Sequence, residues 1–386
     1  MTFGIGIADV GAGYTTVLAG KNSSSILDFG STGYKAALSG LDRMLCHHYH
    51  PYFYWPPWGC PALPATSLVV SHPHRDHFSG LLAYASERGS QGRPALLEGQ
   101  PVKFFHPRIP VNPEALALIQ CLMAIDTVLS GIPEYQLGRA EAACADGRVR
   151  RIPLQIGSPL ELAEQSFDVL WPPHKLSPGL SLRLKHLVEA YDALAARAAE
   201  NDDRRLLDAL SRVREEEALR RDADAGSLYN VPEPSEGERF PDFSTEGDQA
   251  GEEICDDQIG KEMKVLRAAI TSGANCLSLV IATTDRQFVF LGDLDKSLHG
   301  EVAMMLADDR CGVVVSAHHG THFGSGLEVV QSKYVFSSVG GSLSGQVDEG
   351  YSRMGMHLRT DIAGDISARS SRGSIDISTC SCHRTL

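Results

Sequence analysis

The chain has 386 residues, of which 43% are hydrophobic and 22% are charged, and its formal net charge is −13. This composition is that of a globular protein and excludes a disordered, collagen-like or coiled-coil chain. The acidic balance also disfavours binding to DNA or to an anionic membrane through a broad basic surface, because such binding depends on many lysines and arginines.

The N-terminus and the cysteines indicate the compartment. Residues 1–7 contain no basic residue and no apolar core of a signal peptide, and no stretch approaches 18 consecutive apolar residues. Nine cysteines, an odd number spread along the chain, do not form a disulfide framework. We therefore expect a cytoplasmic protein with reduced thiols and no membrane association. The terminal segment 380–383, Cys-Ser-Cys-His, is expected to be a frayed tail rather than a metal site.

The first part of the chain predicts a β-rich domain. Apolar alternation and short apolar runs predict strands over residues 3–7, 15–18, 25–30, 68–70, 101–106, 149–156 and 166–171. Helical spacing predicts helices over 77–88 and 113–129. Residues 49–58 combine six aromatic residues with three prolines and predict a stiff loop, which either covers the core edge or forms one wall of a cleft.

The pattern changes between residues 178 and 265. Apolar residues at helical spacing from Leu180 to Leu194, followed by the charged run 204–221, predict a helical hairpin. Residues 233–257 carry ten acidic residues and one basic residue, which predicts a flexible acidic loop. We interpret residues 178–265 as an insertion between a first half, 1–177, and a second half, 266–386.

The second half is again β-rich. It predicts strands at 277–282, 288–291, 312–316 and 334–338, helical turns near 295–307, and a hairpin over 356–379. Two β-rich parts with helices predict an α/β fold in which a pair of sheets has helices on the outside.

The strongest chemical signal is the segment Ser71-His-Pro-His-Arg-Asp-His77, between a predicted strand and a predicted helix. Imidazole and carboxylate groups cost free energy to bury unless they are paired or bind a metal. In an extended loop His72 and His74 point the same way and can share one ion, whereas Asp76 and His77 project differently and suit a second ion. We predict a metal site here rather than a solvated histidine-rich loop.

Later strand ends supply further ligands. Asp293 follows a predicted strand after a glycine, where its two oxygens can bridge two ions, and His318 follows another predicted strand. His174 also stands after a strand and is favoured as the sixth ligand over its rival, His106. Whether His318 or the adjacent His319 is the last ligand remains open.

These motifs together resemble the metallo-β-lactamase fold, and more narrowly the hydrolase domain of the competence protein ComEC and its soluble relatives. The resemblance covers nearly the whole chain apart from 178–265. Besides the metal motifs, it rests on residues 9–13, 26–30, 169–173, 275–280, 318–320 and 359–364. The chain departs from that subfamily at Ala12, where Gln is usual, and at residues 340–344, which lack an expected Asn and His. Both departures concern the substrate rather than the metal ligands.

The resemblance implies an αββα sandwich of the metallo-β-lactamase type with a helical insertion, and a hydrolase that uses a hydroxide held by two divalent ions, Zn²⁺ or Mn²⁺. The implied ligands are His72, His74 and His174 for one ion, Asp76, His77 and His318 for the other, and Asp293 as the bridge. Asp76 is also expected to orient the nucleophile.

Three further side chains receive an expected role. His319 or His322 would contact a phosphate or protonate the leaving group. Asp28, by resemblance, would orient a ligand histidine.

The resemblance implies a phosphodiester substrate, in nucleic acid or in a nucleotide, and hence a nuclease or phosphodiesterase. Hydrolysis of a carboxylic ester, thioester or lactam is the alternative within the fold. A partner-binding regulatory module that uses the insertion is the alternative outside it. Outside residues 233–257 the net charge is only −4, because that segment alone carries −9. The acidic chain average therefore says little about the site.

Overall fold

The computed structural model describes residues 3–47, 65–92, 95–98, 102–108, 113–131, 136–145, 149–224, 258–307, 309–371 and 374–380. The predicted stiff loop at 49–58 and the predicted acidic loop at 233–257 lie outside these ranges. So does the end of the chain beyond Cys380.

Within the described residues, the first sheet has eight strands in the order β15-β14-β1-β2-β3-β4-β5-β6. The strands are β1 (Phe3–Ile7), β2 (Thr15–Ala19), β3 (Ser24–Phe29), β4 (Ala65–Val69), β5 (Val102–Pro107), β6 (Val149–Leu154), β14 (Asp365–Ser371) and β15 (Ser374–Cys380). Strands β3 to β6 pair in parallel, and the others are antiparallel. The chain therefore returns at its end to complete the sheet with which it began.

The second sheet has seven described strands in the order β13-β12-β11-β10-β9-β8-β7. They are β7 (Pro159–Leu162), β8 (Gln165–Trp171), β9 (Val280–Thr283), β10 (Phe288–Phe290), β11 (Arg310–Val315), β12 (Gln331–Ser337) and β13 (Met356–Arg359). Strands β10 to β13 are parallel. Because the carboxyl ends of parallel strands share one edge of a sheet, the segments after β10 and β11 emerge together.

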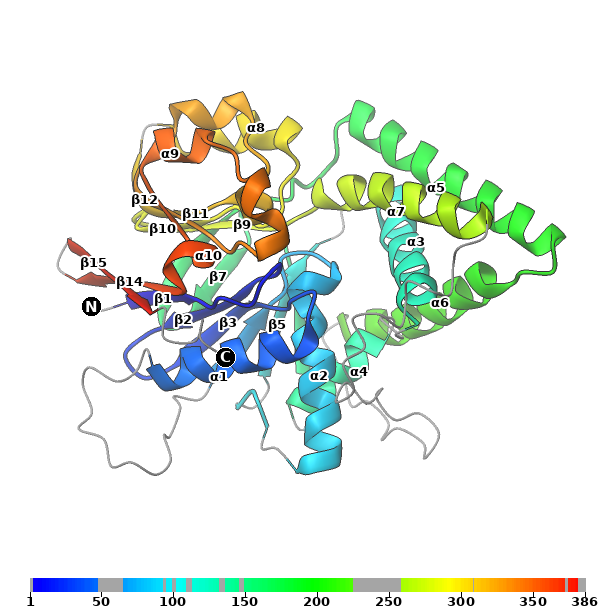
Figure 1. Cartoon of the computed structure of the whole chain (residues 1–386), viewed down its shortest axis with the longest axis horizontal. Coiled ribbons are helices and arrows are strands. Elements are labelled where there is room, and N and C mark those ends of the chain that lie inside the picture. Colours follow the sequence, from blue (N-terminus) through cyan, green and yellow to red (C-terminus); the bar gives the residue numbers. More distant parts are fainter. Residues whose placement is uncertain are drawn as a thin grey trace.

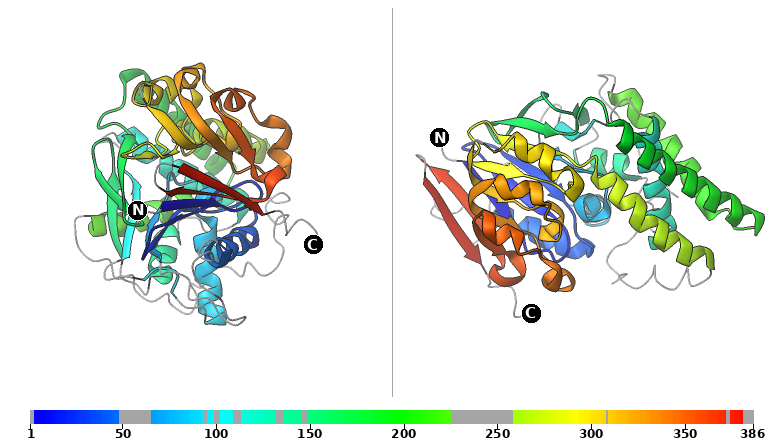
Figure 2. Two further views of the ribbon diagram at one scale, coloured as in Figure 1. Left: turned by 90° about the vertical axis from the view of Figure 1, so that its left-hand side faces the viewer. Right: turned by 90° about the horizontal axis from the view of Figure 1, so that it is seen from above.

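The two sheets pack face to face between helices, which makes the αββα sandwich predicted from the sequence (Figure 1). Helices α1 (Tyr34–His47), α2 (Arg75–Gln91) and α4 (Leu137–Cys144) lie on the outer side of the first sheet. Helices α8 (His299–Met304) and α9 (Gly350–Met354) lie on the outer side of the second. Figure 2 shows the same layers from the side and from above.

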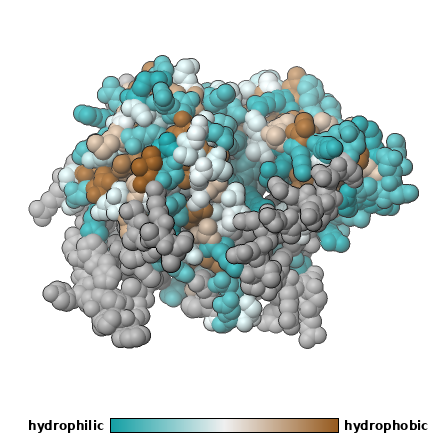
Figure 3. Space-filling model, in the orientation of Figure 1, coloured by the Kyte–Doolittle hydropathy of each residue, from teal (hydrophilic) through white to brown (hydrophobic). Residues whose placement is uncertain are grey.

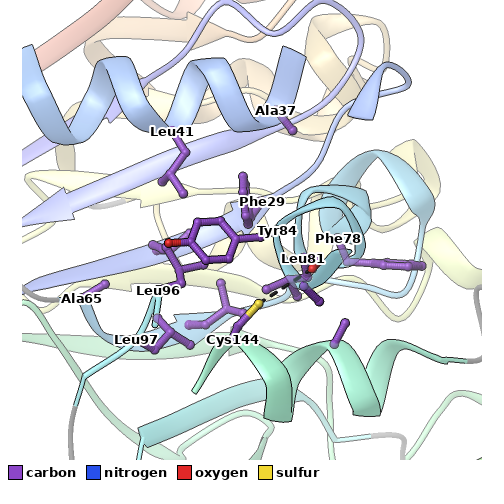
Figure 4. Packing of buried hydrophobic residues seen from close by; sticks show 14 of the residues in the cluster. Phe29, Ala37, Leu41, Ala65, Phe78, Leu81, Tyr84, Leu96, Leu97 and Cys144 are labelled. Atoms are coloured by element: carbon purple, nitrogen blue, oxygen red, sulfur yellow. Dashed lines mark hydrogen bonds between the residues drawn. The ribbon is translucent and has the colours of Figure 1, made fainter. Parts of the chain in front are cut away.

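Separate apolar clusters hold these layers together. Between the sheets, Phe3 packs edge-on against Phe167 and Phe288, with ring centroids 6.0 and 5.2 Å apart. Beneath the first sheet, Phe29 of β3 packs with Phe78 and other side chains of α2, and Figure 4 shows this cluster. Burying such side chains contributes about 1.5–3 kcal/mol each, so these clusters fix where the strand ends lie.

A helical layer stands beside the sandwich. It consists of α3 (Pro113–Ser130), α5 (Pro178–Glu200), α6 (Arg205–Asp224) and α7 (Gln258–Asn275), which bury a common apolar cluster. The predicted helical hairpin corresponds to α5 and α6, whereas α7 was not foreseen and runs across the predicted boundary at residue 265. Figure 3 shows that the surface at this end of the molecule is mainly hydrophilic on the visible face.

Helix α3 is the one described helix with the length and composition of a membrane span. It packs against α5, α6 and α7, and 11 of its residues, among them Leu118, Leu122 and Ile125, are buried. Its apolar character is therefore explained by its central place in the helical layer.

Two expectations need correction. The tail at 356–379 is not one hairpin, because β13 pairs in parallel with β12 in the second sheet, and only β14 and β15 form a hairpin in the first. The left-handed Gly364 (φ 74°) lies between these two parts. The expectation that all cysteines are reduced thiols is wrong at Cys380, which is in a disulfide, whereas the buried Cys121, Cys144, Cys276 and Cys311 are free cysteines.

Candidate metal centre

The histidine-rich segment joins the carboxyl end of β4 to the N-terminus of α2. His72 lies in the connecting loop, and His74 is the extended residue that precedes the helix (φ −100°, ψ 143°). Asp76 and His77 belong to the first helical turn, where a carboxylate interacts favourably with the helix dipole. The two pairs therefore project differently, as the sequence predicted.

Asp28 anchors this segment from the end of β3. Its fully buried carboxylate accepts hydrogen bonds from the backbone N–H of Ser71 (2.6 Å) and the Ser71 hydroxyl (2.7 Å), and it also bonds Nδ1 of His77 (2.7 Å). This contact leaves Nε2 of His77 facing inward. The expectation that Asp28 orients a ligand histidine agrees with this geometry.

Gly30 allows the close approach of β3 to α2. A Cβ at this position would stand 2.4 Å from the backbone carbon of Asp76, so a larger residue would push the helix start away. Gly30 N–H donates to the carbonyl of Tyr14, and Tyr14 N–H donates to that of Asp76. These bonds hold the ligand segment against the first sheet.

Asp293 enters the same space from the second sheet. It follows β10 after Gly292, whose left-handed backbone (φ 54°) leaves no room for a side chain, because a Cβ would lie 2.4 Å from Oγ of Ser278. Asp293 is 1% exposed, with Oδ2 3.8 Å from Nε2 of His72 and Oδ1 3.3 Å from Nε2 of His77. Its two oxygens thus face the two halves of the histidine segment.

Two groups of potential ligands result. In each group the ligand atoms lie within 4.8 Å of one another; one group is His72, His74 and Asp293, and the other is Asp76, His77, His319 and Asp293. Asp293 is common to both groups.

Unsatisfied atoms in this cluster fit a bound cation. Nε2 of His74 is buried and has no hydrogen-bond partner, and Nε2 of His77 and Oδ1 of Asp293 are in ion contact at 3.3 Å but make no hydrogen bond. Buried polar atoms without a partner are rare in native proteins. Imidazole and carboxylate ligands at these positions suit divalent transition metals.

The two histidines after β11 have different surroundings. Both have left-handed backbones (φ 49° and 58°), so their side chains diverge. His319 is buried, with Nε2 2.9 Å from Oδ2 of Asp76 and Nδ1 3.0 Å from the carbonyl of Ser338. His318 is 26% exposed, with Nε2 3.8 Å from Oδ2 of Asp293. The structure thus brings His319, rather than His318, into the second ligand group.

Tyr14, which the sequence reasoning missed, holds His319 in place. Its buried hydroxyl donates to the carbonyl of Ser316 (2.8 Å) and accepts from the backbone N–H of His319 (3.1 Å). The two rings stack with centroids 4.5 Å apart. No sequence motif marks this tyrosine, because its role depends on a contact between the two sheets.

The remaining candidates lie apart from the two ligand groups. His174 is exposed in the turn after β8, and among the described residues neither ligand group includes it. His106 lies at the end of β5 with Nδ1 3.1 Å from the carbonyl of Pro107. His322 stacks on His318, with ring centroids 4.0 Å apart.

The charges in the cluster are mutually dependent. Burial alone would lower the pKa of His77, but Asp293, Asp28 and Asp76 outweigh it and hold that pKa well above its usual value. Burial would raise the pKa of Asp293, yet His77 and His318 hold it well below the usual range. Without a metal, a positive charge on His77 therefore compensates the buried carboxylates.

We expect low pH to reduce the free energy of unfolding of the metal-free protein, because His74 is buried in its neutral form. Burial lowers the pKa of His74 from 6.5 to about 4. The unfolded chain binds this proton below pH 6.5 and the folded chain does not, so the stability contribution is complete above pH 6.5 and falls as the pH drops towards 4. The full loss is about 3 kcal/mol.

We expect His74→Gln to flatten this decline in urea unfolding measured from pH 7 to pH 4. His186→Gln, at an exposed position on α5, is the matched control and should follow the parent protein. Equal pH slopes for the parent and His74→Gln would show that His74 is not buried in its neutral form.

No protein-family model and no curated protein matches the sequence. Among solved structures, the chain is similar to the metallo-beta-lactamase fold protein YhfI from Bacillus subtilis, with 10% identity, 98% of this chain and 100% of that chain covered, and a TM-score of 0.36. It is also similar to the sec-alkylsulfatase Pisa1 from Pseudomonas sp. The identity is 12%, the match covers 69% of this chain and 48% of Pisa1, and the TM-score is 0.24. At these TM-scores neither likeness decides what this chain does. The two packed sheets between helices form an αββα sandwich, and a cluster of histidine and aspartate side chains that could hold metal ions lies at its strand ends.

Proposed function

We propose that the chain is a dinuclear metal-dependent hydrolase that cleaves phosphodiesters, as a nuclease or nucleotide phosphodiesterase related to the ComEC hydrolase domain. The observation that carries the proposal is the pair of ligand groups that share Asp293, with buried atoms in both that make no hydrogen bond. Bound at these groups, two Zn²⁺ or Mn²⁺ ions would supply Lewis acidity and lower the pKa of water near the substrate.

We assign His72, His74 and Asp293 to one ion and Asp76, His77, His319 and Asp293 to the other. His319 fits a ligand role better than that of a proton donor, because both of its ring nitrogens already face partners, Ser338 and Asp76. His174, being exposed, is not included in this assignment.

His318 is then the proposed contact with the substrate. It stands beside Asp293, is partly exposed, and is held by Thr321 (Nδ1 to Oγ1, 2.7 Å) and by stacking on His322. In hydrolysis the oxygen of water bonds to phosphorus, the bond to the leaving oxygen breaks, and that oxygen needs a proton. A protonated His318 would donate it or would bind a phosphate oxygen.

A substrate panel tests the proposal. The full chain would be assayed with Mn²⁺ or Zn²⁺ on single- and double-stranded DNA, RNA, cyclic nucleotides, bis-p-nitrophenyl phosphate, a carboxylic ester, a thioester, a lactam and an alkyl sulfate. We expect phosphodiester cleavage that is lost in His74→Ala and kept in His186→Ala. Turnover of only the ester, thioester, lactam or sulfate would refute the phosphodiester assignment, and activity that survives His74→Ala would place the chemistry elsewhere.

A further inference from the structure

The segment 316–322, which follows β11, carries His318, His319 and His322 in an unusual backbone conformation. His318 and His319 are both left-handed (φ 49° and 58°). This conformation is unfavourable for residues other than glycine and persists only where the surrounding contacts impose it. The side chains that hold this segment therefore decide where its three histidines point.

Tyr351 of α9 closes the segment at both ends with a single hydroxyl group. The tyrosine is fully buried, and its hydroxyl accepts a hydrogen bond from the backbone N–H of Ala317 (3.0 Å). The same hydroxyl donates to the carbonyl of His322 (2.6 Å). His318 lies between these two anchors, so the hydroxyl fixes the part of the backbone from which the His318 ring extends.

The place of Tyr351 is itself determined by contacts with this part of the chain. A Cβ at Gly350 would overlap the ring of Phe323, so the glycine leaves room for that ring. The Phe323 ring packs edge-on against Tyr351, with centroids 5.1 Å apart. The backbone N–H of Asp348 donates to the carbonyl of Gly320 (2.8 Å). The start of α9 is thus packed directly against the histidine-bearing segment.

We propose that Tyr351 is a positioning residue of His318: its hydroxyl fixes the segment so that the His318 ring stands beside Asp293 before a substrate binds. The proposal rests on the function proposed above, in which His318 contacts the substrate. Tyr14 has the corresponding place at His319, because its hydroxyl accepts a hydrogen bond from the backbone N–H of that residue. Each tyrosine would thereby set the direction of one of the two adjacent histidines.

Nuclear magnetic resonance of the histidine rings in the full metal-free chain tests this role without an activity assay. Tyr351→Phe keeps the ring and removes the hydroxyl, and we expect it to shift or broaden the ring signals of His318 and His322. Tyr191→Phe is the matched control, because the buried Tyr191 hydroxyl donates to the carbonyl of Leu206 (3.0 Å) in the helical layer. The control should also lower the thermal midpoint, but it should leave both histidine signals unchanged.

Kinetics separate positioning from a general loss of stability. Under the proposed function, Tyr351→Phe should lower kcat/KM for a phosphodiester about 10- to 100-fold with two ions still bound, which is less than the loss of a proton donor itself. In a His318→Gln background the same change should have no further effect, because the side chain that it positions is already absent. Losses that multiply in the double variant would show that Tyr351 acts only on the fold, and would overturn the proposal.

Unchanged His318 and His322 signals in Tyr351→Phe, or equal changes in Tyr191→Phe, would also overturn it. The thermal midpoint of each variant verifies folding. Should Tyr351→Phe not fold, hydrogen exchange of the parent protein decides: the Ala317 amide should be protected as well as the amides of β11, and rapid exchange there would refute its bond to Tyr351. Altered histidine signals in a chain that cleaves no phosphodiester would support the positioning role and refute only the proposed substrate.

Discussion

Under the proposed function, Asp293→Asn is expected to reduce kcat/KM for a phosphodiester by about 10²- to 10⁴-fold, because Asp293 would help to hold both ions, and these would supply several kcal/mol of transition-state stabilisation. Asparagine preserves the shape of the side chain but removes the charge and one of the two oxygens. Since Asp293 faces both His72 and His77, its loss should also reduce the bound metal below two ions per chain. Steady-state kinetics with bis-p-nitrophenyl phosphate and elemental analysis of the same samples measure both effects.

Asp285→Asn is the matched control for this variant. Asp285 is exposed in the turn between β9 and β10, where it accepts a hydrogen bond from the backbone N–H of Gln287 (3.2 Å). It should keep parental activity and metal content. If Asp293→Asn kept two ions and more than about a tenth of the activity, Asp293 would not be the bridge.

The sequence alone was sufficient to predict a candidate metal ligand where that residue directly follows a strand. The segment from His72 to His77 and Asp293 were predicted from their positions after apolar runs, and the structure brings them together. The physical reason is that burial of the apolar strands fixes where their carboxyl ends lie, so polar residues at those ends meet. The αββα layers followed from the same pattern of strands.

Sequence spacing could not decide which of two adjacent histidines belongs to a ligand group. His318 and His319 have identical chemistry and neighbouring positions, and their roles differ only because left-handed backbones send their side chains in different directions. Similarly, a strand end at His174 indicates nothing about the direction of the following turn. Tyr14 acts across the two packed sheets, and such a contact leaves no periodic signal in the sequence.

Replacing Asp28 with alanine is expected to lower the free energy of unfolding of the metal-free protein by about 3–5 kcal/mol, because removing one partner of a buried ion pair leaves the other uncompensated. The lost carboxylate satisfies two donors of Ser71 and one ring nitrogen of His77, all of them buried. Urea unfolding at pH 7 measures the loss. Metal affinity should also fall by about 10- to 100-fold, since His77 would lose the contact that directs Nε2 inward.

Asp168→Ala is the control that measures how much stability is lost when an ordinary, partly exposed ion pair is removed. Asp168 pairs with Arg286 at 2.5 Å, but its side chain is 40% exposed, so its removal should cost no more than about 1 kcal/mol. Equal losses in the two variants would mean that Asp28 contributes only as an ordinary surface pair would. A large loss for Asp28→Ala with unchanged metal affinity would assign it to the fold alone, because orientation of His77 predicts that stability and metal binding fall together.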